Sequence, residues 1–157
     1  MIWPEDVISI ILATILGAVI GIERELSGKA AGLRTNVLIC LGAAIFTIIS
    51  KRMVDVTEGS TTRIAAQIVT GVGFLGAGAV IQDRGGVHGL TTAATIWLVA
   101  SIGMACGAGF YKLAVASTLI VIIVLLGLLQ LVRFLKRYKK KISTESIPED
   151  KDEQSPL

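Results

Sequence analysis

The chain has 157 residues, of which 53% are hydrophobic and 17% are charged, and its formal net charge is +3. This composition excludes an ordinary water-soluble globular protein, and the bunching of charges between long neutral runs indicates an integral membrane protein. The basic excess follows directly on the last apolar run, which is typical of a segment at an inner membrane surface and not of a nucleic-acid-binding protein.

Five apolar runs predict five transmembrane helices, because about 20 apolar residues span a hydrocarbon core of ~30 Å. The runs cover about residues 7–22, 34–50, 64–81, 90–106 and 113–132. We therefore predict an all-α membrane bundle over residues 1–135, and a basic, then acidic tail over residues 136–157 that we expect to be disordered. Six basic residues just after the last run place the tail in the cytoplasm by the positive-inside rule, and five spans then leave the amino terminus outside.

The first and third runs carry glycines at spacings that suit close contacts between helices. Small residues let neighbouring backbones approach in lipid, so we expect these glycines to be helix-packing positions. They are Gly17, Gly21, Gly71, Gly73, Gly76 and Gly78. The third run also matches a dinucleotide-binding fingerprint, but no strand precedes the match and the segment is long and apolar, so we do not expect a nucleotide site.

The first two runs share a pattern with the third and fourth. The segment GAVI at 17–20, the pair Glu23-Arg24 and the segment GLRT at 32–35 recur as GAVI at 78–81, Asp83-Arg84 and GLTT at 89–92. The copies lie two spans apart and would have the same orientation, as in a parallel repeat. Chance similarity between glycine-rich apolar sequences is the alternative. A true repeat would bring both acid–base pairs to one cytoplasmic surface.

Polar residues at the predicted cytoplasmic helix ends are the main candidates for a functional cluster. Opposite charges at this depth are partly desolvated, so pairing of Glu23 or Glu25 with Arg34 would lower the cost of burial. Threonines there would either cap helix amino termini or line a polar pocket. Ordinary anchoring at the membrane interface is the alternative. The candidates are Glu23, Arg24, Glu25, Arg34, Asp83, Arg84, Thr91 and Thr92.

Two polar residues, Arg63 and Gln67, lie one helical turn apart on the predicted outer side. An amide in hydrocarbon usually forms a hydrogen bond across to another helix. The sequence contains no nucleophile–base set, no cysteine–histidine metal spacing and no phosphate loop, so we expect neither an enzyme nor a cofactor or metal centre.

Four segments resemble the MgtC/SapB family of bacterial and archaeal inner-membrane proteins. They are GAVIGIERE at 17–25, AGLRTNVL at 31–38, RIAAQIVTGVGFLGAGAVI at 63–81 and GLTTAATIW at 89–97. The resemblance covers roughly residues 7–135 and implies a five-span domain with an outer amino terminus. It also implies a role in magnesium-limited growth and, in some pathogens, in survival inside host cells. Such members resemble regulators of other membrane proteins, including the F-type ATP synthase.

Longer members of this family continue into a cytoplasmic ACT-like domain, whereas about twenty polar residues follow Lys136 here. The chain therefore resembles a short form, and we expect any regulatory role to run through its membrane spans.

Two functions remain open from the sequence. In the first, the chain is a non-enzymatic regulator whose glycine faces on the first and third spans dock against another copy or a partner complex. In the second, it is a small cation or proton transporter or channel, with Glu23, Glu25 and Asp83 at a cytoplasmic mouth and Gln67 deeper. No carboxylate lies near mid-membrane, where coupling sites of secondary transporters usually lie, and this favours the regulator. In both, lipids surround the chain and no nucleic acid is bound.

Overall fold

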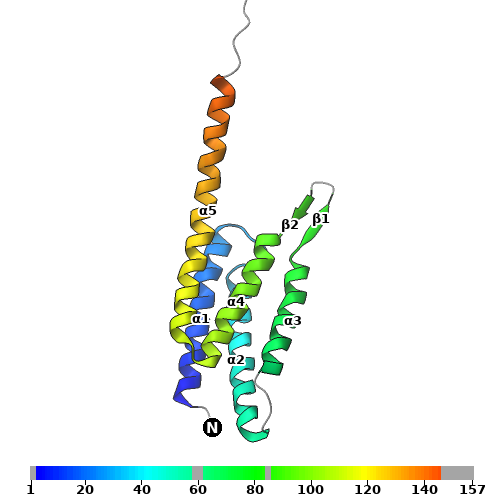
Figure 1. The fold of residues 1–157 in the computed structure, drawn as a ribbon, viewed down its shortest axis with the longest axis vertical. Helices are drawn as coiled ribbons and strands as arrows, with labels where there is room; N and C mark the ends of the chain where they lie inside the picture. Colours follow the sequence, from blue (N-terminus) through cyan, green and yellow to red (C-terminus); the bar gives the residue numbers. More distant parts are fainter. Residues whose placement is uncertain (1–2, 58–61, 84–85, 146–157) are drawn as a thin grey trace, which may run out of the picture. The chain divides into compact units, whose positions relative to one another are not determined.

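The computed structural model describes residues 3–57, 62–83 and 86–145, which form five α-helices and one two-stranded antiparallel sheet (Figure 1). The helices are α1 (Pro4–Leu26), α2 (Leu33–Thr57), α3 (Thr62–Gly78), α4 (Leu90–Ala108) and α5 (Tyr111–Glu145). The strands are β1 (Ile81–Asp83) and β2 (Gly86–His88). The chain divides into two compact units, Met1–Ile122 and Ile123–Leu157, and the bundle described below is the first of them.

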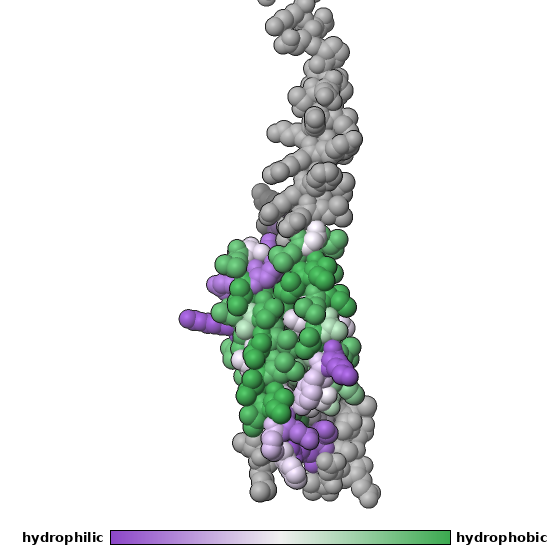
Figure 2. Space-filling model, turned by 90° about the vertical axis from the view of Figure 1, so that its left-hand side faces the viewer, coloured by the Kyte–Doolittle hydropathy of each residue, from purple (hydrophilic) through white to green (hydrophobic). Residues whose placement is uncertain are grey.

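Membrane-length helices dominate the described residues. α1, α2, α4 and α5 each contain a stretch long and apolar enough to cross a membrane, whereas α3 has 17 residues. On one face of the molecule, a wide hydrophobic surface covers the helices and hydrophilic side chains gather below it (Figure 2). The predicted all-α membrane bundle is therefore confirmed. The outer position of the amino terminus and the internal repeat stay predictions.

In α1, one side of the helix packs against neighbouring helices and the other side is exposed. Ala13, Leu16 and Ile20 recur at helical spacing and are buried, whereas Ile11 and Ile15 lie on the other side and are half exposed. Glu5 and Asp6 lie in the first turn, where carboxylates favour the positive end of the helix dipole. Pro4 begins the helix, where a missing N–H costs nothing.

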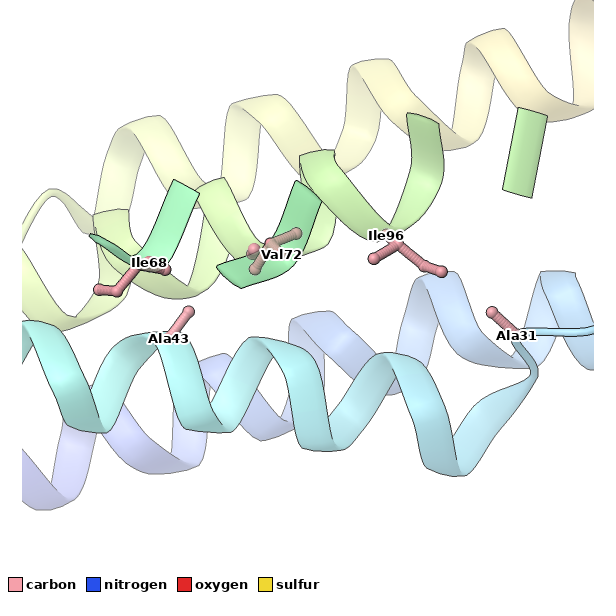
Figure 3. Close-up of a cluster of buried hydrophobic side chains, with 6 residues drawn as sticks. Ala31, Ala43, Ile68, Val72 and Ile96 are labelled. Atoms are coloured by element: carbon pink, nitrogen blue, oxygen red, sulfur yellow. The ribbon is translucent and has the colours of Figure 1, made fainter. Parts of the chain in front are cut away.

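The bundle core is made of small side chains. α2 packs against α1 and α4, and α3 packs mainly against α4. Gly17 and Gly103 allow this approach, because a Cβ at Gly17 would lie 2.8 Å from Cys40 Cβ and a Cβ at Gly103 would collide with the Cys40 carbonyl oxygen. Between α2, α3 and α4, buried side chains point toward one another (Figure 3). This cluster consists of Ala31, Ala43, Ile68, Val72, Ile96 and Ala100.

The third helix is shorter than predicted. The sequence predicted a span over residues 64–81, but α3 ends at Gly78, and Ala79 and Val80 form turn hydrogen bonds back to Gly76 and Ala77. Two helix-weakening glycines near this end explain the stop. The residues after α3 form a hairpin in which Ile81 faces His88 across the two strands.

The last helix is longer than predicted. α5 continues as a helix to Glu145, so the first part of the tail expected to be disordered from residue 136 is helical. Lysine and arginine are good helix formers, and the loss of apolar periodicity after residue 135 therefore does not end the helix. Residues 146–157 lie outside the described residues.

Candidate functional site

An arginine is buried at the carboxyl end of α1. Arg24 lies one turn beyond Ile20 and Gly21 on the buried face of the helix and is only 1% exposed. Its neighbour Glu23 is 8% exposed. The charges pair only loosely, with 3.6 Å between Arg24 Nη1 and Glu23 Oε2, while Ser27 Oγ donates a hydrogen bond of 2.8 Å to Glu23 Oε1.

The buried pair leaves polar atoms without hydrogen-bond partners. Among the described residues, Arg24 Nε and Nη2, Glu23 Oε2 and Asn36 Oδ1 are buried and accept or donate no hydrogen bond. Buried polar atoms are normally satisfied, and a loosely paired buried charge is costly. We call Glu23, Arg24 and Asn36 the buried polar centre. It is the most strongly polar part of the bundle interior in the described chain.

Asn36 joins this centre from the first turn of α2, and the sequence interpretation missed it. The residue is fully buried, and its Nδ2 donates to the carbonyl oxygens of Ala31 and Gly32 at 2.8 Å each. Gly21 makes room for it, because a Cβ at Gly21 would lie 3.3 Å from Asn36 Cβ. The signal was present as an amide at the start of an apolar run, where lipid exposure would be unfavourable.

Glu25 has a structural role between α1 and α2. Its Oε2 accepts the Leu33 backbone N–H at 2.9 Å, so the carboxylate caps the first turn of α2. Gly32 leaves the space for this contact, since a Cβ there would collide with Glu25 Oε2. Arg34 is exposed, and the expected pairing with Glu23 or Glu25 is not observed in the described part of the chain.

The threonines at the start of α4 do not cap the helix. The N-cap residue is Gly89, with φ of 87°, and no side chain bonds there. Thr92 is buried, while Thr91 is exposed and accepts a hydrogen bond of 2.8 Å from Thr95 Oγ1 through its carbonyl oxygen. Thr92 therefore adds a buried hydroxyl near the start of α4, a helix that packs against α1, α2 and α3.

Two further candidates cannot be placed. Asp83 belongs to β1 by its backbone, but its side chain and the whole of Arg84 lie outside the described residues. The expected approach of this pair to Glu23 and Arg24 stays a prediction.

The outer candidates lie on the surface of α3. Arg63 and Gln67 are both exposed. Gln67 lines an apolar groove of about 610 Å³ between α2 and α3, together with Gly42, Gly71 and Phe46. In the described residues the Gln67 amide has no partner.

The six predicted packing glycines divide into two groups. Gly17 and Gly21 contact α2 closely, because an added Cβ would lie 2.8 Å from Cys40 Cβ and from Leu33 Cα respectively. Gly76 is near Ala93, at 3.7 Å from an added Cβ. A Cβ at Gly71, Gly73 or Gly78 would meet no described neighbour within 4 Å. At 100° per residue, Gly71 and Gly78 lie on the same side of α3 as Gln67, whereas Gly73 lies on the opposite side. We call Gly71 and Gly78 the open glycine face of α3.

No group of three or more metal-binding side chains occurs among the described residues. The arrangement offers one buried charge pair, a capped helix start and an open helix face.

Comparison with known proteins agrees with these features. The model of the MgtC family matches residues 10–134. YhiD of Escherichia coli strain K12, described as a candidate magnesium transporter, is 46% identical over 127 residues, covering 77% of this chain and 59% of that protein. MgtC of Salmonella typhimurium strain LT2 is 47% identical over 116 residues, covering 74% of this chain and 49% of that protein.

The match therefore spans about half to three fifths of the length of these curated relatives. No solved structure is significantly similar to the chain. The family match covers most of the bundle, including the buried polar centre and the open glycine face. This chain belongs to the MgtC family of multi-pass membrane proteins.

Proposed function

We propose that this chain is a non-enzymatic regulator in the inner membrane that acts on other membrane proteins during adaptation to low magnesium. One observation carries the proposal: α3 presents an open glycine face beside an apolar groove, whereas the glycines of α1 are already used inside the bundle. Transmembrane helices associate through small residues that let backbones approach. The glycine face of α1, which the sequence suggested as a docking surface, is thus covered by α2. We therefore assign the docking surface to α3.

Gln67 adds a polar element to this surface. Its amide lies in a groove that is otherwise apolar and finds no partner in the described chain. A helix that entered the groove could satisfy it, because interhelical amide hydrogen bonds form readily in lipid. The link to magnesium rests on the names of the relatives, and the F-type ATP synthase is one candidate partner that the family resemblance implies. A second copy of the chain is another.

Co-purification from mild detergent tests the docking role. Gly71→Leu adds bulk to the open glycine face at a position that lines the groove and whose added Cβ would meet no described atom within 4 Å, so we expect it to preserve folding and to remove a bound membrane partner. Ala116→Leu adds the same kind of bulk to an exposed position on α5 and serves as the matched control. A partner retained by both variants would contradict the role of the open glycine face.

A small cation or proton transporter is the second candidate, and the buried polar centre favours it. Buried charges inside membrane proteins often lie on ion or proton pathways. Reconstitution into liposomes with a flux assay separates the two functions. Glu25→Gln keeps an oxygen that can accept the Leu33 N–H but removes the charge at the predicted mouth. Flux in the wild type that is abolished in this variant would overturn the regulator-only proposal.

A further inference from the structure

A second polar site lies at the other end of α1, where the sequence offered no candidate. A pocket of about 320 Å³ opens between the start of α1, the end of α2, the end of α4 and the start of α5. Its walls include two acidic residues, two basic residues and two aromatic residues. They are Trp3, Glu5, Asp6, Lys51, Arg52 and Tyr111.

Internal contacts hold the walls of this pocket in place. Arg52 forms an ion pair with Asp6, and its guanidinium lies over the Trp3 ring at 5.5 Å from the centroid. Ser9 and Tyr111 share a hydrogen bond of 3.0 Å between their hydroxyl groups, which joins α1 to α5. The Tyr111 hydroxyl also lies 3.4 Å from the Glu5 carbonyl oxygen. Contacts among α1, α2 and α5 thus hold these walls together before any ligand binds.

Two charges of opposite sign remain for a ligand. Asp6 and Arg52 neutralise each other, whereas the Glu5 carboxylate and the Lys51 ammonium have no partner in the described chain. A simple anion would be repelled by Glu5, and a metal cation would be repelled by Lys51. A neutral molecule that carries one anionic and one cationic group matches both free charges.

The location identifies the source of such a molecule. The pocket lies where the membrane-length stretches beginning at Pro4 and Tyr111 start and those ending at Met53 and Ala108 finish. Helix ends of this kind lie at the membrane–water boundary, where tryptophan and tyrosine are enriched. We propose that the pocket binds the zwitterionic headgroup of a phosphoethanolamine lipid, with its phosphate toward Lys51 and its ammonium toward Glu5.

Native mass spectrometry of the full chain in mild detergent tests this site, with phosphatidylethanolamine and phosphatidylglycerol of identical acyl chains as probes. The wild type should retain phosphatidylethanolamine about threefold better, the size expected for partly exposed ion pairs. Glu5→Gln and Lys51→Gln should each remove this preference. The double variant Glu5→Lys with Lys51→Glu should restore it, because the two free charges are exchanged and not lost.

Lys112→Gln is the matched control, since Lys112 lies at the same helix end but does not line this pocket. Equal retention of both lipids by the wild type would overturn the proposal, as would an effect of Lys112→Gln equal to that of Lys51→Gln. Soluble phosphoethanolamine that displaces the lipid at similar concentration would assign the pocket to a free zwitterion and overturn the lipid assignment.

Discussion

Removing the charge of Arg24 is the sharpest perturbation of the buried polar centre. In Arg24→Met the long side chain is kept, but Glu23 loses its cation while it remains 8% exposed. A double variant, Glu23→Gln with Arg24→Met, removes both charges and keeps an acceptor for Ser27 Oγ. The two variants separate the cost of an unpaired buried charge from the value of the pair itself.

The expected magnitudes follow from the geometry. Breaking a buried ion pair by removing one partner typically costs about 3–5 kcal/mol, whereas replacing both partners is often neutral or stabilising. Here the pair is loose, at 3.6 Å, and Arg24 Nε and Nη2 have no hydrogen-bond partner, so its own contribution to stability is small. We expect the single variant to lose about 3 kcal/mol and the double variant to lie within ~1 kcal/mol of the wild type.

Unfolding of the purified chain in mixed micelles, followed by tryptophan fluorescence, measures both values. If the double variant is as unstable as Arg24→Met, the guanidinium itself stabilises the bundle and the reasoning from unsatisfied atoms is wrong. A double variant that folds normally but no longer supports adaptation to low magnesium would indicate that the two charges serve the function of the chain and not its stability.

Three further predictions use the same unfolding assay. Gly17→Ala should destabilise the bundle by about 1–3 kcal/mol, because the added methyl group overpacks against α2. Gly73→Ala should not destabilise it, because the space around Gly73 is open, and equal losses of stability in the two variants would contradict the division of the glycines. Glu25→Ala should cost about 1 kcal/mol because the Leu33 N–H loses its cap, and Glu25→Gln should recover most of it, a difference that would vanish if the cap were unimportant. Asn36→Leu should cost roughly 1–3 kcal/mol by removing two backbone hydrogen bonds, and an unchanged stability would show that these bonds contribute nothing net.

The helices were predictable because their apolar runs are long and separated by charged turns. The ends of the helices were not predictable from hydropathy, since the helix propensities of the local residues decide where each helix ends. Gly76 and Gly78 weaken the end of α3 although the apolar run continues to Ile81, and the lysines after residue 135 continue α5 although the run has ended. Hydropathy describes where a chain can enter lipid, whereas helix length depends on backbone preferences as well.

The candidate site was predictable only in part. The pattern of Ala13, Gly17, Ile20 and Gly21 on α1 already puts Arg24 on the buried face, but the sequence suggested Arg34 as a partner for its acidic neighbours. That partner depends on how the loop before α2 folds, and the loop directs Glu25 to a backbone N–H instead.

Glycine spacing likewise predicts a packing face without saying what covers it. The glycines of α1 lie against α2, whereas Gly71, Gly73 and Gly78 of α3 lie against nothing described within 4 Å. Which helix covers a glycine face depends on the tertiary packing of the bundle. The same glycine spacing can therefore form a buried contact in one helix and an open surface in another.

The role of the open glycine face can be tested directly by photo-crosslinking in intact cells grown at low magnesium. A photoreactive amino acid would replace Gly71, and in a parallel strain it would replace Ala116. We predict that the Gly71 position crosslinks to a defined transmembrane segment, of another membrane protein or of a second copy, while the Ala116 position does not. Crosslinks to lipid alone at both positions, or the same protein captured at both, would contradict a docking function for α3.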